Sequence, residues 1–255
     1  MIRCLALAIC FKLAKCNMEG FIVGGSHALI TRYPHSAFMN ANCVTSDKKT
    51  LKWICGASIV NQQVLLTAAH CLASCTSSSS IRINVGSENK QRGIINSVSS
   101  FLVHEDYSAK SSYADIGLIK MSRRLNFGSK ISRVALMRKP PQGEIASVAG
   151  WGLTDEDLTV TSPYLKYINQ TVKNRRDCLK RLGEVPRGCI CASSNKLSDY
   201  ASAGDSGSAL MIRGYIQIGI VSHKVPSVSR QIIVYTETAY FYNWIKDNMD
   251  RLFCS

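Results

Sequence analysis

Residues 66–71 have the sequence LTAAHC, one of three short stretches that together decide the fold and the function. The other two are DIGLI at residues 115–119 and GDSGS at residues 204–208. Each stretch alone is weak, because a histidine beside a cysteine, an aspartate before an apolar strand and a glycine-rich turn are common. Together they place a histidine, an aspartate and a serine in that order along the chain, which is far more specific.

His70, Asp115 and Ser206 are the residue types that a serine hydrolase needs. A serine hydroxyl is a weak nucleophile near neutral pH and requires a neighbouring base. Histidine can serve because its pKa lies near neutrality, and a buried carboxylate can fix its tautomer. The order Asp-first is that of subtilisin and the order Ser-first that of α/β-hydrolases, so the order found here excludes both. The chain is predicted to use these residues as a catalytic triad.

The loop around Ser206 also predicts an oxyanion hole. The backbone N–H groups of Gly204 and Ser206 can point at one developing negative charge, and glycine tolerates the strained backbone that such a turn requires.

Short runs of alternating apolar residues predict an all-β architecture. Ile81, Ile83 and Val85 alternate with polar residues, and residues 215–221 form a mostly apolar run. The C-terminus differs, because apolar residues there recur at spacings of three and four, which is typical of one helical face. They are Tyr242, Ile245, Met249 and Leu252. Thr236 or Thr238 is the expected cap of this helix.

The first residues and the cysteines indicate export. Residues 1–14 are predicted as a signal peptide, because Arg3 precedes an apolar run, although Lys12 interrupts that run. Residues 15–21 are predicted as a short propeptide. Eleven cysteines suit an oxidising compartment, and eight remain once Cys4, Cys10 and Cys16 are removed. We therefore expect a secreted, extracellular protein. Asn169 begins a glycosylation sequon.

The charge and hydropathy exclude some functions and leave others open. No run of about 18 apolar residues occurs, so no transmembrane segment is expected. The net charge of +14 is spread along the chain in pairs without interleaved aromatics, which argues against a nucleic-acid partner. It fits either a solvated basic surface or attraction to a polyanion. No metal or cofactor is expected, since Cys189 and Cys191 alone do not make a zinc site.

Beyond the triad segments, IVGG at residues 22–25, GWG at 150–152 and VYT at 234–236 resemble the trypsin and chymotrypsin family of secreted serine proteases. The resemblance covers residues 22–255. It implies one peptidase domain of two packed antiparallel Greek-key β-barrels with a C-terminal α-helix. It also implies peptide or protein substrates, protease inhibitors as partners, and a monomer.

The resemblance further implies a zymogen and a set of disulfides. Cleavage after Phe21 would free the ammonium of Ile22, which would insert beside Asp205. Two bridges are implied, Cys55–Cys71 and Cys178–Cys191. For the remaining cysteines the pairing cannot be proved from sequence, and Cys43–Cys75 with Cys189–Cys254 is the preferred choice.

The specificity pocket is where the chain departs from the family pattern. Tyr200 falls at the expected pocket base, where trypsins have an aspartate, and Lys224 and Ile233 replace glycines beside Ser222. The pocket is expected to be shallow, blocked or unusual. A local shift would instead bring Asp199 to the base. His223 replaces the usual tryptophan next to Ser222.

Two functions follow from these residues. The first is a secreted endopeptidase that acts through an acyl-enzyme and is activated by cleavage before Ile22. The second is a cationic protease-like binding protein with an occluded pocket and little proteolysis. The complete triad with Gly204 and Asp205 favours the enzyme, because a binding protein has no physical need for all five residues.

Overall fold

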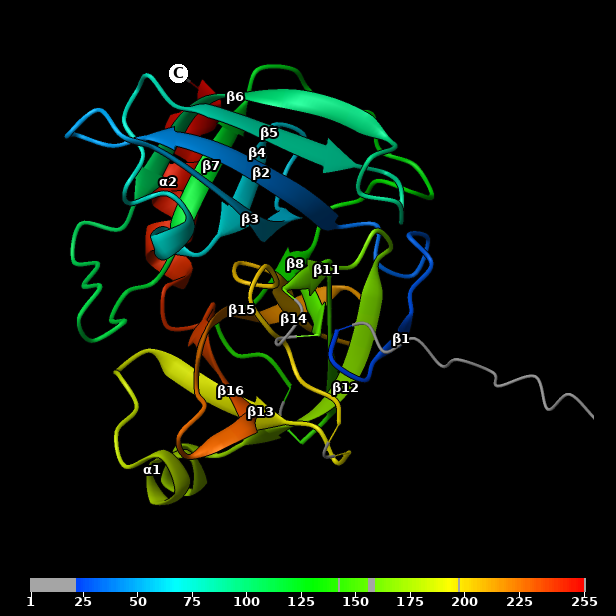
Figure 1. The fold of residues 1–255 in the computed structure, drawn as a ribbon, viewed down its shortest axis with the longest axis vertical. Coiled ribbons are helices and arrows are strands. Elements are labelled where there is room, and N and C mark those ends of the chain that lie inside the picture. The colour runs from blue at the N-terminus through cyan, green and yellow to red at the C-terminus, as the bar shows by residue number, and fades with distance from the viewer. Residues whose placement is uncertain (1–21, 142, 156–158, 197, 255) are drawn as a thin grey trace, which may run out of the picture.

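The computed structural model describes residues 22–141, 143–155, 159–196 and 198–254, and for Cys254 the backbone alone (Figure 1). The expected signal peptide and propeptide, with Cys4, Cys10, Cys16 and Phe21, lie outside these residues. The described chain forms two β-barrels, one above the other in Figure 1, with a long helix beside the upper barrel.

The first barrel is a closed antiparallel sheet in the order β2-β3-β4-β7-β6-β5. Its strands are β2 (Ser36–Val44), β3 (Thr50–Ile59), β4 (Val64–Thr67), β5 (Ser80–Val85), β6 (Ile94–Val103) and β7 (Gly117–Met121). In β5, Ile81, Ile83 and Val85 are buried while Ser80 and Arg82 are exposed, as the alternating pattern predicts. One face of each strand therefore fills the barrel interior.

The second barrel has the strand order β12-β13-β16-β15-β14-β9, and pairing between β9 and β12 closes it. Its strands are β9 (Ile145–Gly150), β12 (Lys166–Lys173), β13 (Cys189–Ser193), β14 (Ala209–Ile212), β15 (Ile216–Val225) and β16 (Ser229–Glu237). Four short strands complete the described strands: β1 (Ser26–His27), β8 (Ala135–Leu136), β10 (Leu153–Asp155) and β11 (Val160–Thr161). The predicted pair of antiparallel barrels is confirmed.

Helix α2 (Tyr242–Cys254) confirms the helix predicted at the C-terminus. Ile245 is fully buried in the core of the first barrel, and Met249 and Leu252 pack against that core. The expected caps were wrong. Thr236 and Thr238 lie before the helix and donate hydrogen bonds to Asp115 O and Gln217 O, each at 2.8 Å. In the part of the chain that the structure describes, no helix is long and apolar enough to cross a membrane.

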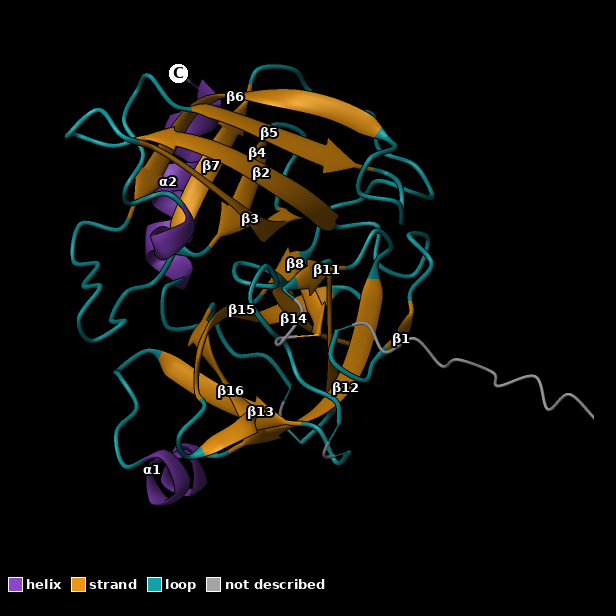
Figure 2. Cartoon of the chain, in the orientation of Figure 1, coloured by secondary structure: helices purple, strands orange, loops and turns teal. Residues whose placement is uncertain are grey.

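Helix α1 (Arg175–Leu182) lies at the far end of the second barrel and was not predicted (Figure 2). Asn174 caps it by accepting a hydrogen bond from the Asp177 N–H at 2.8 Å. Gly183 ends it with a positive φ of 76°, a conformation that favours glycine. The helix is short and polar, so its apolar periodicity is weak.

Candidate active site

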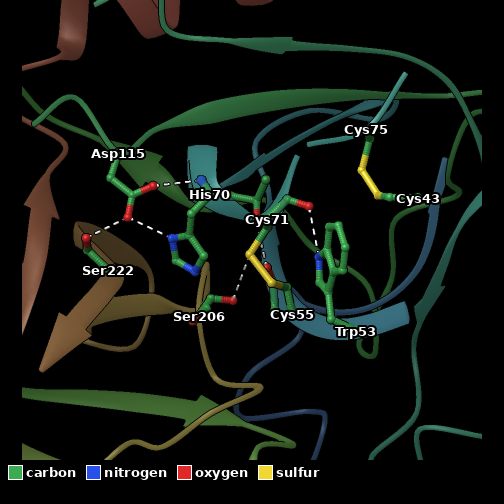
Figure 3. The surroundings of a disulfide bond; sticks show 11 residues. Cys43, Trp53, Cys55, His70, Cys71, Cys75, Asp115, Ser206 and Ser222 are labelled. Carbon is green, nitrogen blue, oxygen red and sulfur yellow. Dashed lines mark hydrogen bonds and ion pairs between the residues drawn. A yellow bond between two sulfur atoms is a disulfide. The ribbon is translucent and has the colours of Figure 1, made fainter. Parts of the chain in front are cut away.

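His70 is held in a short 3-10 helix, η1 (Ala69–Cys71), which follows β4. The disulfide Cys55–Cys71 ties this turn to β3, and Trp53 Nε1 donates a hydrogen bond to Cys71 O at 3.1 Å (Figure 3). Both contacts join Cys71, the residue after His70, to β3, so the turn that carries His70 is anchored to the first barrel. The His70 side chain remains 34% exposed, so the imidazole can meet a substrate.

Asp115 lies two residues before β7 and is buried next to His70. One carboxylate oxygen, Oδ1, accepts from the His70 N–H at 2.9 Å. The other, Oδ2, accepts from His70 Nδ1 at 2.8 Å and from Ser222 Oγ at 2.6 Å. Thr236 Oγ1 holds the Asp115 backbone by donating to its carbonyl. One backbone N–H and two side chains therefore hold this carboxylate, and a third side chain, that of Thr236, holds its backbone.

The electrostatics of the pair define the histidine tautomer. Burial opposes ionisation of Asp115, but the hydrogen bonds from His70 and Ser222 and the nearby imidazole outweigh it, so the pKa of Asp115 lies below its usual value. An ionised carboxylate can only accept hydrogen bonds. His70 Nδ1 must therefore carry the proton, which leaves the lone pair on Nε2 when the ring is neutral.

Ser206 lies on the opposite side of the His70 ring from Asp115 (Figure 3). Its loop is pinned to the first barrel, because Gly56 N–H donates to Ser206 O at 2.7 Å, and to β15, because Gly207 N–H donates to Val221 O at 2.8 Å. Among the described residues Ser206 Oγ makes no hydrogen bond to His70. Such bonds are often loose in ligand-free serine hydrolases and tighten with substrate.

Gly204 occupies a turn that only glycine fits. Its φ is +94°, and a Cβ added there would lie 2.9 Å from Ile54 Cδ1 and 3.0 Å from Gly152 Cα. In the described chain neither the Gly204 N–H nor the Ser206 N–H donates a hydrogen bond within the protein. Both donors are therefore unoccupied, as the predicted oxyanion hole requires.

Asp205 lies between Gly204 and Ser206 in the sequence, and it is fully buried. Its carboxylate accepts hydrogen bonds from Gly152 N at 2.8 Å and Ser202 N at 2.9 Å. Burial raises its pKa to about 6, partly offset by these two bonds and by the charge of Lys224. A Cβ at Gly150 would lie 2.1 Å from Asp205 Oδ1, which explains the glycines of the GWG motif.

Ile22 is also fully buried, in the core of the second barrel together with Tyr200. Its neighbour Val23 accepts a hydrogen bond from Tyr200 N at 3.1 Å. Gly24 has a φ of +85°, and a Cβ there would meet Asp199 Oδ1 at 2.3 Å. Residues 22–25 thus pack closely against the segment that leads to Asp205.

Three of the predicted pocket residues, Tyr200, Lys224 and Ile233, lie together. Tyr200 and Ile233 are buried in one cluster. Lys224 Nζ lies 4.7 Å from the centre of the Tyr200 ring and 3.5 Å from Ser202 Oγ. Lys224 is also opposite Ile233 in the pairing of β15 with β16.

Asp199 does not face this cluster. Its Oδ1 accepts from Ser198 Oγ at 2.8 Å and lies against Gly24, on the side of the N-terminal segment. Ser222 was assigned to the pocket, and sequence reasoning missed its hydrogen bond to Asp115. No local signal reveals that contact, because the two residues are 107 positions apart.

Three disulfides are present among the described residues: Cys43–Cys75, Cys55–Cys71 and Cys178–Cys191. The preferred bridge Cys189–Cys254 was wrong, because Cys189 is a free, buried thiol. Gly188 packs against Tyr240 and Phe241, just before α2, whereas Cys254 ends that 13-residue helix, roughly 20 Å along its axis. The sulfurs of Cys55 and Cys71 lie near His70, but their mutual bond removes them as thiolate metal ligands.

Comparison with known proteins assigns the family. The trypsin family model matches residues 22–245. The chain belongs to the trypsin family. Trypsin delta of Drosophila melanogaster is 32% identical over 239 residues, covering 91% of this chain and 90% of that protein. Hypodermin-B of Hypoderma lineatum is 30% identical over 244 residues, covering 91% and 89%.

Solved structures agree with this assignment at the level of the fold. HL collagenase superposes with a TM-score of 0.75 at 22% identity, covering 89% of this chain and 98% of that one. The scabies mite inactivated protease paralogue S-D1 superposes with a TM-score of 0.77, also at 22% identity, covering 90% and 98%. The trypsin-family chain is a serine endopeptidase, and its family implies peptide substrates and protease inhibitors as partners.

Proposed function

We propose that this trypsin-family protease is secreted and cuts peptide bonds through an acyl-enzyme, with His70, Asp115 and Ser206 as its catalytic residues. The supporting observation is the contact of His70 Nδ1 with Asp115 Oδ2 at 2.8 Å, with Ser206 on the other side of the ring. Three disulfides among the described residues favour an oxidising, extracellular setting.

In the proposed mechanism Ser206 Oγ attacks the scissile carbonyl carbon while His70 Nε2 takes the hydroxyl proton. The Gly204 and Ser206 N–H groups stabilise the resulting oxyanion. The carbon–nitrogen bond then breaks, and His70 returns the proton to the leaving amine. Water repeats the sequence on the acyl-enzyme and releases the carboxylic acid and the free Ser206. Asp115 remains ionised throughout and stabilises the imidazolium.

Activation by cleavage before Ile22 is part of this proposal. In the uncut chain the Ile22 nitrogen belongs to a peptide bond and carries no charge. Asp205 is then a buried carboxyl whose pKa is raised to about 6, because burial disfavours its charge. Cleavage would create an ammonium at the fully buried Ile22 end, close to the Asp205 loop. A cation there would stabilise the ionised carboxylate and hold the oxyanion donors in place.

The pocket supports an unusual substrate preference. Tyr200 provides no carboxylate for a basic side chain, and the Lys224 ammonium repels one. A buried cation without a partner carries a large desolvation penalty. Tyr200 and Ile233 also occupy volume that a large aromatic side chain would need. Small apolar or acidic residues before the scissile bond are therefore the proposed substrates.

A second function is favoured by the same pocket. The Lys224 side chain covers Tyr200, which suits a protease-like binding protein with little turnover. One structural neighbour is itself described as an inactivated protease paralogue, so this fold alone does not guarantee catalysis. The complete arrangement of His70, Asp115 and Ser206 favours the enzyme.

Labelling with a serine-directed fluorophosphonate separates the two functions. The reagent mimics the tetrahedral intermediate, so it requires the nucleophile, the base and the oxyanion donors but no filled pocket. We expect the protein cut before Ile22 to label at Ser206, and its Ser206→Ala variant to remain unlabelled. No labelling of the cut wild type would favour the binding protein.

A further inference from the structure

His223 places a second imidazole at the active site. The residue follows Ser222 in β15, and its Nδ1 lies 3.1 Å from Ser222 Oγ. The same Ser222 Oγ lies 2.6 Å from Asp115 Oδ2. His223 therefore stands two hydrogen bonds away from the carboxylate that orients His70. The family pattern has a tryptophan at this position, which could not complete such a chain because both of its ring atoms bonded to Cγ are carbons.

The direction of each hydrogen bond follows from proton counting. Asp115 is an ionised acceptor, so Ser222 must use its one hydroxyl proton to donate to Oδ2. That proton is then unavailable for His223. The contact between Ser222 Oγ and His223 Nδ1 is a hydrogen bond only if Nδ1 carries a proton and donates it. Burial lowers the pKa of His223, so its ring is neutral at neutral pH.

We propose that His223 is a positioning residue of the catalytic machinery, because its Nδ1–H donates to Ser222 Oγ and thereby holds the Ser222 hydroxyl on Asp115. The inference rests on the proposed function of the triad. His223 Nδ1–H donates to Ser222 Oγ, and the Ser222 hydroxyl donates to Asp115 Oδ2. His70 Nδ1–H donates to the same Oδ2 atom. Ser222 is left with a single orientation, and the Asp115 carboxylate keeps both of its side-chain donors during turnover.

This arrangement also sets what His223 presents to a substrate. With the proton on Nδ1, the neutral ring carries a lone pair on Nε2, across the ring from Ser222. His223 is partly exposed, and no described residue donates a hydrogen bond to Nε2. A peptide N–H or a hydroxyl group bound at this face would find an acceptor there, whereas a carbonyl would not.

The tautomer can be measured without any turnover. The protein for this measurement carries Ser206→Ala, is cut before Ile22 and has its histidines labelled with ¹⁵N. Above pH 7, its NMR spectrum should show that Nδ1 of His223 is protonated and that Nε2 is not. A protonated Nε2 and bare Nδ1 would overturn the proposal, because no donor to Ser222 would then exist. This outcome is independent of whether the enzyme cuts peptides.

Kinetics of two variants test the positioning role. His223→Asn keeps an N–H donor near the Nδ1 position, whereas His223→Leu has similar size and no donor. One neutral hydrogen bond contributes about 1 kcal/mol, so we expect kcat of the leucine variant to be lower than that of the asparagine variant by roughly fivefold. Equal kcat values, with KM alone changed, would show that His223 only forms a wall of the cleft and would overturn the proposal.

Discussion

Lys224 Nζ lies 4.7 Å from the centre of the Tyr200 ring, so the cation that we place at the rim of the proposed specificity pocket covers the aromatic residue proposed for its base. A cation over an aromatic face is stabilised electrostatically, by about 0.5–2 kcal/mol depending on desolvation. A substrate side chain that enters the proposed pocket would have to displace or complement this pair. We therefore expect the contact to govern which peptides the enzyme accepts.

Substrate preference should follow from this contact. On matched peptides with Arg, Phe, Ala or Asp before the scissile bond, we expect poor kcat/KM for Arg, because Tyr200 has no charge to pair with it and Lys224 repels it. The double variant Lys224→Gly with Ile233→Gly should open the pocket and raise turnover of Phe and Leu substrates.

A dominant preference for Arg in the wild type would contradict this assignment. It would mean that Asp199 turns from Gly24 and Ser198 toward the pocket base. Asp199→Asn is the matched control, since the structure places that carboxylate outside the pocket and predicts an unchanged order of preference.

The nucleophile and base should be indispensable. Ser206→Ala or His70→Ala, in the protein cut before Ile22, should lower kcat by at least about three orders of magnitude, because the oxyanion donors and substrate binding alone supply only residual catalysis. The measurement is peptide hydrolysis at matched concentrations of folded protein. Substantial activity in Ser206→Ala would refute the mechanism.

Asp205 should make the uncut chain less stable as pH rises. Its folded-state pKa of about 6 exceeds the usual value, so the protonated form is favoured by folding. The stabilisation of the folded state by protonated Asp205 is fully present below about pH 4 and is lost as pH rises through about 6. A shift from 3.8 to about 6 corresponds to about 3 kcal/mol. Asp205→Asn in the uncut chain should remove this dependence.

Urea unfolding between pH 4 and 7, in a Ser206→Ala background, measures the effect. Asp250→Asn, at an exposed carboxyl of α2, serves as the control and should leave the slope unchanged. Cleavage before Ile22 should also abolish the fall in stability, because the new ammonium stabilises the charged carboxylate. A fall that persists in the cut protein would argue against an Ile22–Asp205 pair.

Cys189 should be a protected thiol. It is buried, and burial raises its pKa to about 12, so little thiolate exists at pH 8. Iodoacetamide should leave it unmodified in the native protein and modify it after unfolding without reductant, as peptide mass spectrometry can show. Failure to label the unfolded, unreduced chain at Cys189 would mean that this cysteine is bridged.

Local residue patterns were enough to predict an all-β architecture with a C-terminal helix and the three residue types of the triad, whereas the two barrels were implied by the family resemblance. The alternation of Ile81, Ile83 and Val85 and the spacing of Ile245 and Met249 depend on which face of one element is buried, and that information is local. Helix α1 escaped prediction because it is held by the Asn174 cap and by Gly183 rather than by a strong apolar stripe.

Contacts between distant segments were decided only by the tertiary structure. Ser222 on β15 of the second barrel reaches Asp115 of the first barrel because the two barrels pack against each other. The bridge Cys43–Cys75, the preferred choice that the sequence could not prove, is confirmed by the structure. Cys189 stays free because it begins β13 near the start of α2, whereas Cys254 is the last residue of that helix. A sequence specifies which side chains exist, but the distance between two of them depends on how every intervening strand pairs and packs.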